Sequence, residues 1–261
     1  MSIEIKEAAF SYRKGPPVFE GLNFSAQTSG VFCLLGPNGC GKTTLLKCLA
    51  GLVTLRSGEI LLQGRSIGSL KHTAIASIIG YIPQEHAYSF AYSVFDMVLM
   101  GRAPHLGMFS SPSKKDFIIA GECLDRVGIA HLRDKRFTEI SGGERQMVLI
   151  ARVLAQTPRI MLLDEPTNHL DFRNQTLILR IISNLAADGL IVIMTSHIPN
   201  HAITYASHVT LMNCGRLVVS GNPEDVITEK NLREIYSMDV RVFEISDPLT
   251  GNTLKFCEPL K

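Results

Sequence analysis

No stretch of this sequence is apolar for long enough to cross a membrane. The longest apolar runs, such as Leu190–Met194, fall far short of the roughly 18–20 residues that a spanning helix needs. The first residues, MSIEIKEAAF, lack the basic start and apolar core of a secretory signal. We therefore expect a cytosolic protein, or one that reaches a membrane only through a partner.

The sequence also lacks an excess of charge of one sign. It has 26 Lys and Arg against 24 Asp and Glu, with no basic run, which disfavours a nucleic-acid partner. Its six cysteines include no CxxC pair, so we expect free thiols rather than a zinc site or a redox pair. With 46% hydrophobic and 19% charged residues, the chain can bury a core and is not disordered.

Three short apolar runs each end in a polar cluster. Val31–Leu35, Ile160–Leu163 and Leu190–Met194 have the length and composition typical of strands buried on both faces of a parallel sheet. Ligands of open α/β sheets lie just beyond the carboxyl ends of the strands. The clusters that follow, GPNGCGKTT, DEPTNHLD and TSH, are therefore expected to form one site.

Helices are expected between these strands, because apolar residues recur there at helical spacing. Two such stripes should face the core: Met147, Ile150, Ala151 and Leu154, and Ile178, Ile181, Ile182 and Leu185.

The run GPNGCGKT at 36–43 fits the phosphate-binding pattern G-x-x-x-x-G-K-[ST], between an expected strand and an expected helix. Its glycines let backbone N–H groups turn toward phosphate oxygens, and the helix N-terminus adds its own. Lys42 would reach the β- and γ-phosphates, and the Thr43 hydroxyl would ligate Mg²⁺. The pattern predicts a nucleoside triphosphate site formed by Gly36, Pro37, Asn38, Gly39, Cys40, Gly41, Lys42, Thr43 and Thr44.

Cys40 lies inside this loop, near Lys42 and the helix N-terminus. We expect its thiol to be more acidic and more reactive than that of a buried cysteine.

Two adjacent carboxylates follow the strand expected at 160–163. Asp164 is placed to hold Mg²⁺, directly or through water. Glu165 is placed to orient and deprotonate an attacking water, as a general base does.

The segment SGGERQ has the form of a helix start. Ser141 and Glu144 fit a capping box, and Gly142 and Gly143 leave backbone N–H groups open to an anion. The segment also matches the signature of ABC ATPases, and the order of the surrounding motifs resembles that family.

The other family landmarks follow in the same order. Tyr12 in FSY resembles the aromatic residue that stacks on adenine, and Gln84 in GYIPQ resembles the Q-loop glutamine. DEPTNHLD resembles Walker B running into the D-loop at Asp171, and His197 in MTSH resembles the H-loop histidine. The resemblance covers Tyr12 to His197, and we identify the chain as a member of the ABC ATPases.

The resemblance implies a fold and a domain plan. It implies an α/β P-loop NTPase core with a mostly parallel sheet, an N-terminal antiparallel β portion and an inserted helical subdomain. Residues 1–261 would form one ABC ATPase domain, with a discontinuous nucleotide-binding core at 1–85 and 159–235. Residues 86–158 would form the helical subdomain and 236–261 a C-terminal hairpin, since VRVFEI and TLKFCEPL flank a Pro- and Gly-containing connection.

The resemblance also implies a mechanism. Two copies would face each other head to tail, with ATP between the P-loop of one and Ser141–Gly143 of the other. Glu165 would be the base, while His197 would bridge the γ-phosphate and the attacking water. Gln84 would sense Mg²⁺ and water.

The chain departs from the family at two positions. Cys40 stands where Ser or Ala is common, and Ile198 stands where Asp often follows the H-loop histidine, which leaves His197 without an obvious neighbouring carboxylate. His197 and His201 stand four apart and suggest a metal pair, although Pro199 interrupts a helix between them.

Three kinds of ABC protein remain open: an importer subunit, a half-size exporter ATPase and a soluble ATPase outside transport. The segment 87–107 and the ending GNPEDVIT, LREIY and DVRVFEISDPLTGN resemble importers of siderophores, haem, cobalamin and some oxyanions. That class implies two permease subunits, an extracytoplasmic solute-binding protein and a peripheral place on the cytoplasmic face of the inner membrane. Apolar residues near Tyr88, Phe90 and Tyr92 are expected to contact the permease.

Overall fold

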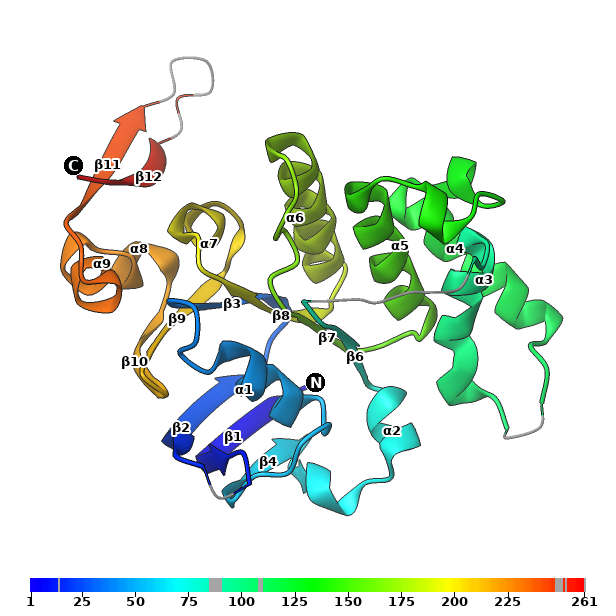
Figure 1. The fold of residues 1–261 in the computed structure, drawn as a ribbon, viewed down its shortest axis with the longest axis horizontal. Coiled ribbons are helices and arrows are strands. Elements are labelled where there is room, and N and C mark those ends of the chain that lie inside the picture. The colour runs from blue at the N-terminus through cyan, green and yellow to red at the C-terminus, as the bar shows by residue number, and fades with distance from the viewer. Residues whose placement is uncertain (14, 85–90, 108–109, 247–250, 252, 261) are drawn as a thin grey trace.

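The computed structural model describes residues 1–13, 15–84, 91–107, 110–246, 251 and 253–260. Within these ranges the strands form a six-stranded sheet, a four-stranded sheet and a two-stranded hairpin. Figure 1 shows helix α1 between the two larger sheets and helices α6 and α7 on the other side of the six-stranded sheet. No helix in the described part of the chain has both the length and the hydropathy needed to cross a membrane.

The six-stranded sheet has the order β10-β9-β3-β8-β7-β6. Its β9, β3, β8, β7 and β6 are parallel, and β10 pairs antiparallel at one edge. The expected strands are confirmed, although the last begins and ends later than its apolar run. The bounds are β3 (Gly30–Leu35), β6 (Ile79–Ile82), β7 (Ile160–Leu163), β8 (Ile191–Ser196), β9 (His208–Asn213) and β10 (Arg216–Gly221).

Both faces of this sheet are buried. Leu34, Leu162 and Ile193 point to one core, which also contains α1 (Lys42–Leu49) and the N-terminal strands. Leu163 and Met194 point to the other, which contains the helices α3 to α6. Burial on both faces explains why these strands have continuous apolar runs rather than alternating ones.

The N-terminal strands form an antiparallel sheet in the order β2-β1-β4-β5. The mixed α/β fold with this antiparallel portion is confirmed. The strands are β1 (Ile3–Ser11), β2 (Pro17–Ala26), β4 (Ser57–Leu62) and β5 (Arg65–Ser66), followed by the 3₁₀ turn η1 (Ile67–Ser69) and helix α2 (His72–Ala76).

The part of the chain that connects β6 to β7 forms a group of helices, on the right of Figure 1. Arg102 joins two of these elements, because its Nε donates to Asp116 Oδ1 at 2.8 Å and both side chains are buried. The expected apolar stripe of 147–154 faces the core, as does that of 178–185 with Ile181 only partly buried. The elements between β6 and β7 are α3 (Val94–Leu99), η2 (Met100–His105), α4 (Lys114–Val127), η3 (Ala130–Leu132), η4 (Phe137–Glu139) and α5 (Gly142–Ala155), and α6 (Phe172–Ala187) follows β7.

The chain ends in the expected hairpin. Strand β11 (Val240–Ser246) pairs antiparallel with β12 (Thr253–Pro259), and Figure 1 shows it projecting from the end of the molecule opposite to α4. The hairpin follows α7 (Pro199–Tyr205), α8 (Pro223–Val226) and α9 (Glu229–Tyr236).

Helix α4 tests this packing, because it carries apolar residues on both a buried and an open face. Leu124 is 1% exposed in the large core, whereas Ile118 on the same helix is 60% exposed. We expect Leu124→Ala to lower the free energy of unfolding by about 2–5 kcal/mol, through lost burial and a residual cavity. Ile118→Ala should change it by about 0.5 kcal/mol or less. Urea unfolding measures both, and equal effects would contradict the placement of α4.

Candidate active site

The phosphate-binding loop joins β3 to α1. Gly41 precedes the helix with φ 108°, and a side chain there would meet Met212 and Val18, so glycine is required. The Lys42 ammonium is buried and donates to the carbonyls of Gly36 at 2.7 Å and Pro37 at 3.0 Å. The Lys42 side chain therefore folds back onto the phosphate-binding loop.

Asp164 follows β7 and lies beside the start of α1. Its Oδ1 accepts hydrogen bonds from the hydroxyls of Thr43 at 3.1 Å and Thr195 at 2.8 Å. Its Oδ2 is buried and has no hydrogen-bond partner among the described residues. Burial raises the pKa of this carboxyl despite the two hydroxyls.

An unpartnered buried carboxylate oxygen beside a threonine hydroxyl fits a hard cation. Mg²⁺ prefers oxygen ligands and commonly takes one or two from protein, with the rest from water and phosphate. Thr43 and Asp164 therefore have the chemistry of a suitable pair for Mg²⁺.

Side chains from three other parts of the sequence lie close to the Glu165 carboxylate. Its Oε2 accepts from Gln84 Nε2 at 3.3 Å and lies 3.3 Å from His197 Nδ1. Its Oε1 lies 3.7 Å from Lys42 Nζ, and the side chain is only 8% exposed. His197 thus has a neighbouring carboxylate after all, although the residue that follows it in sequence is Ile198.

The backbone of Glu165 is in a conformation that non-glycine residues seldom adopt. Its φ is 47°, in the left-handed region. Its N–H donates to the Thr195 hydroxyl at 2.8 Å. Strain of this kind persists only where the surroundings hold it, and it concentrates at functional sites.

Thr195 is a site residue that sequence reasoning missed. Its fully buried hydroxyl accepts from the Glu165 N–H and donates to Asp164, so it links the two carboxylate residues. The available signal was a threonine at the end of the apolar run before His197.

The two histidines suggested as a metal pair have different partners. His197 precedes α7 and lies beside Glu165, whereas His201 lies within α7 with its Nδ1 3.4 Å from the Thr167 hydroxyl. Over the described residues, no group of three or more His, Cys, Asp or Glu side chains is arranged to hold a metal.

The signature segment starts α5 with the expected capping box. Glu144 Oε2 accepts from the Ser141 N–H at 2.7 Å, and the Ser141 hydroxyl accepts from the Glu144 N–H. Gly143 packs so closely on Asn174 that an added Cβ would lie 2.5 Å from its Cγ. Asn174 is held by Asp171, which caps α6 through the Asn174 N–H at 2.8 Å.

The structure therefore divides the predicted site into three parts. It brings Lys42, Thr43, Asp164, Glu165, Gln84 and His197 together at the carboxyl edge of the parallel sheet. It places Ser141–Gly143 and Asp171 at the starts of α5 and α6. Tyr12 is half exposed near the loop, with its hydroxyl 3.2 Å from that of Thr44.

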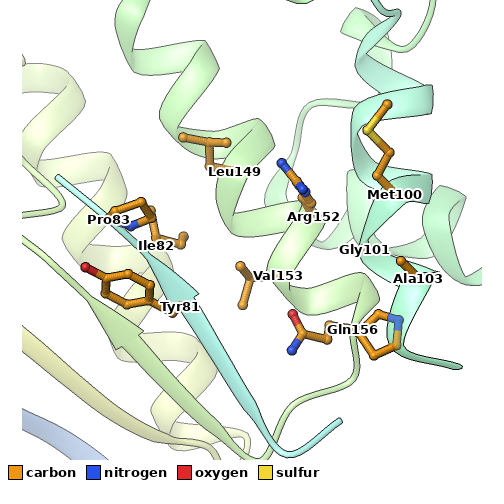
Figure 2. A pocket seen from close by; sticks show the side chains of 11 residues that line it. Tyr81, Ile82, Pro83, Met100, Gly101, Ala103, Leu149, Arg152, Val153 and Gln156 are labelled. Carbon is orange, nitrogen blue, oxygen red and sulfur yellow. The ribbon is translucent and has the colours of Figure 1, made fainter. Parts of the chain in front are cut away.

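A cavity of about 380 Å³ lies beside the strand that leads to Gln84. Tyr81, Ile82 and Pro83 at the end of β6 form one wall, and α5 and η2 form the others (Figure 2). The lining residues from α5 and η2 are Leu149, Arg152, Val153, Gln156, Met100, Gly101, Ala103 and Pro104.

The segment expected to contact the permease is described only in part. Tyr88 and Phe90 lie outside the described residues, and Tyr92 is 43% exposed. Val94, Met97 and Val98 are buried in α3 and belong to the core.

The expectation of an acidic Cys40 thiol is wrong. Its side chain is buried, and burial raises the pKa of the thiol more than Lys42 and the backbone N–H groups lower it. The Cys40 side chain belongs to the core cluster that also contains Leu45, Leu46 and Leu49 of α1.

We therefore expect Cys40 to resist alkylation. Because a raised pKa leaves less thiolate at pH 8, and burial blocks the reagent, iodoacetamide should modify Cys40 roughly tenfold or more slowly than the exposed Cys214. Its rate should still be rising above the pH at which an ordinary thiol has fully ionised. Mass spectrometry of timed samples measures both rates, with urea-unfolded protein as the control. Faster labelling of Cys40 than of Cys214 would restore the original expectation.

Comparison with known proteins agrees with this geometry. The family model described as ABC transporter matches residues 19–168. A probable iron chelatin transport ATP-binding protein of Helicobacter pylori J99 is 37% identical over 251 residues, which cover 95% of this chain and 98% of that protein. A molybdate import ATP-binding protein of Haemophilus influenzae is 34% identical over 238 residues, covering 91% and 88%.

A solved structure of a metal-chelate type ABC transporter in an inward-facing conformation is similar along the whole chain. Its TM-score is 0.88 at 32% identity, and the match covers 100% of this chain and 97% of that one. The resemblance drawn from the motifs is therefore confirmed. The chain belongs to the ABC transporter family, as one of its ATPases.

Proposed function

We propose that this chain is the ATPase subunit of an importer of metal chelates or related solutes, such as siderophores, haem, cobalamin or oxyanions. The chemistry is supported most by one observation, the convergence of Lys42, Asp164, Glu165 and His197 at one edge of the sheet. The direction of transport is supported by relatives named for iron chelatin transport and molybdate import.

In this proposal the loop at 36–44 binds the phosphates of ATP. Lys42 leaves the carbonyls of Gly36 and Pro37 to contact the β- and γ-phosphates, and the half-exposed Tyr12 ring stacks on adenine. Thr43 and Asp164 hold Mg²⁺. The bound cation neutralises charge on the phosphates.

Glu165 is the proposed general base. A water beside its carboxylate gives up a proton to it as the water oxygen attacks the γ-phosphorus, and the bond from that phosphorus to the bridging oxygen breaks so that ADP leaves. His197 and Gln84, both 3.3 Å from Oε2, orient that carboxylate and the water. Phosphoryl transfer depends mainly on positioning and charge stabilisation, and these side chains supply both.

The second copy of the chain completes the site in this proposal. Ser141 and Gly142 are exposed at the start of α5, where helix N–H groups favour an anion. Residues 86–158 form the helical subdomain that carries this segment to the partner's ATP, with Asp171 at the contact. Two permease subunits and an extracytoplasmic binding protein supply the path and the selectivity, and they hold the ATPase at the cytoplasmic face of the inner membrane.

Replacement of the proposed base tests the chemistry. Glu165→Gln keeps the size and one acceptor oxygen but removes the negative charge and proton acceptance, so we expect turnover to fall by about 10²–10⁴-fold. ATP binding should persist, and the ATP-bound dimer should become trapped. Phosphate release and size-exclusion chromatography with ATP measure these effects. Glu59→Gln, at an exposed position of β4, is the matched control.

The same variant tests the transport role in cells. Uptake of a ferric siderophore should be lost with Glu165→Gln and retained with Glu59→Gln. Loss of molybdate uptake instead would indicate that the transported substrate is an oxyanion. Unchanged uptake of both would contradict an importer of this class, and near-normal hydrolysis would remove Glu165 from the role of base.

The cavity beside Gln84 is the proposed contact for the permease. Ala103 is exposed at its rim, so Ala103→Glu should weaken co-purification with the permease by roughly tenfold or more, through a desolvated charge. ATP binding by the isolated subunit should not change. Ile118→Glu, at an exposed position of α4 that does not line the cavity, is the control. Normal assembly and transport by the Ala103 variant would place the contact elsewhere.

A further inference from the structure

The C-terminal part of the chain contacts the backbone of His197. The hydroxyl of Tyr236, the last residue of α9, donates to the His197 carbonyl at 3.1 Å across 39 residues of sequence. Burial raises the pKa of Tyr236, so its hydroxyl remains protonated and available as a donor at physiological pH.

A second connection, made of two hydrogen bonds, joins the C-terminal part of the chain to Asn200, three residues after His197. Asn200 Nδ2 donates to the Cys257 carbonyl at 3.1 Å, and the Cys257 N–H donates to Asn200 Oδ1 at 2.8 Å. Asn200 is in the first turn of α7 and Cys257 is in β12, so the hairpin is bonded to the helix that follows His197. The segment 197–200 is thus held by the C-terminal part of the chain at both ends.

The imidazole of His197 has little to hold it in place by itself. Its Nδ1 is buried without a hydrogen-bond partner among the described residues, although Glu165 Oε2 lies 3.3 Å away. The orientation of the ring toward Glu165 therefore depends on the backbone at 197. That backbone leaves β8 through a short turn, in which the Ile198 N–H donates to the Ser196 hydroxyl at 3.0 Å.

We infer that Tyr236 is a positioning residue for ATP hydrolysis, which acts by fixing the His197 carbonyl and hence the approach of the imidazole to Glu165. Asn200 and β12 support the same segment from its other end. On this inference, α9 and the C-terminal hairpin help to position a residue of the active site. The inference rests on the proposed role of His197.

Removal of one hydroxyl tests it. Tyr236→Phe keeps the ring against the core, so the fold and the KM for ATP should be retained. We expect kcat to fall about three- to tenfold, the range that one hydrogen bond is worth. Asn200→Ala should lower kcat in the same way. Tyr205→Phe, whose ring packs against the same core from α7, is the matched control. Thermal melts of every variant check the fold.

A double-mutant cycle separates positioning from a general structural effect. If Tyr236 acts through His197, Tyr236→Phe should have no further effect on single-turnover hydrolysis in a His197→Ala background. An equal loss in both backgrounds would overturn the inference, as would wild-type kcat in both Tyr236→Phe and Asn200→Ala. Full turnover by His197→Ala alone would instead reject the proposed role of His197, so the two failures are distinguishable.

Discussion

The arrangement of the site depends on the two hydrogen bonds of the Thr195 hydroxyl. It accepts from the strained backbone of Glu165 and donates to Asp164, so one buried group at the end of β8 fixes two consecutive residues at the end of β7. With that peptide held in the left-handed region, the two carboxylates are turned to different partners. Asp164 is directed to Thr43, and Glu165 to Lys42, Gln84 and His197.

Much of the fold and of this site could be predicted, because both are governed by local patterns. The runs before Gly36 and Asp164 are apolar since both sheet faces are buried. The capping box at Ser141 needs only two residues three positions apart. Strand order also brings His197 to Asp164 and Glu165, because β8 pairs with β7 in parallel register.

The parts that could not be predicted depend on how deeply a side chain is buried and on contacts between residues far apart in the sequence. Cys40 lies in the same loop as Lys42, but the direction of its side chain decides whether N–H groups or burial control its pKa. Thr195 has the composition of an ordinary strand end, and only its two hydrogen bonds reveal its role. Tyr236 lies 39 residues from His197, and no spacing rule connects them.

These contacts place Glu165 between two distant parts of the molecule. On one side, Gln84 follows Pro83 at the end of β6, where the chain lines the cavity, and the Gln84 amide donates to Glu165. On the other side, His197 lies beside the same carboxylate and is tied through its carbonyl to α9. A shift of either Gln84 or His197 would change the surroundings of a single oxygen, Oε2, which accepts from Gln84 and lies 3.3 Å from His197 Nδ1. If the proposed roles hold, a partner in the cavity would act on Glu165 through Gln84, and a displacement of the C-terminal hairpin would act on it through His197.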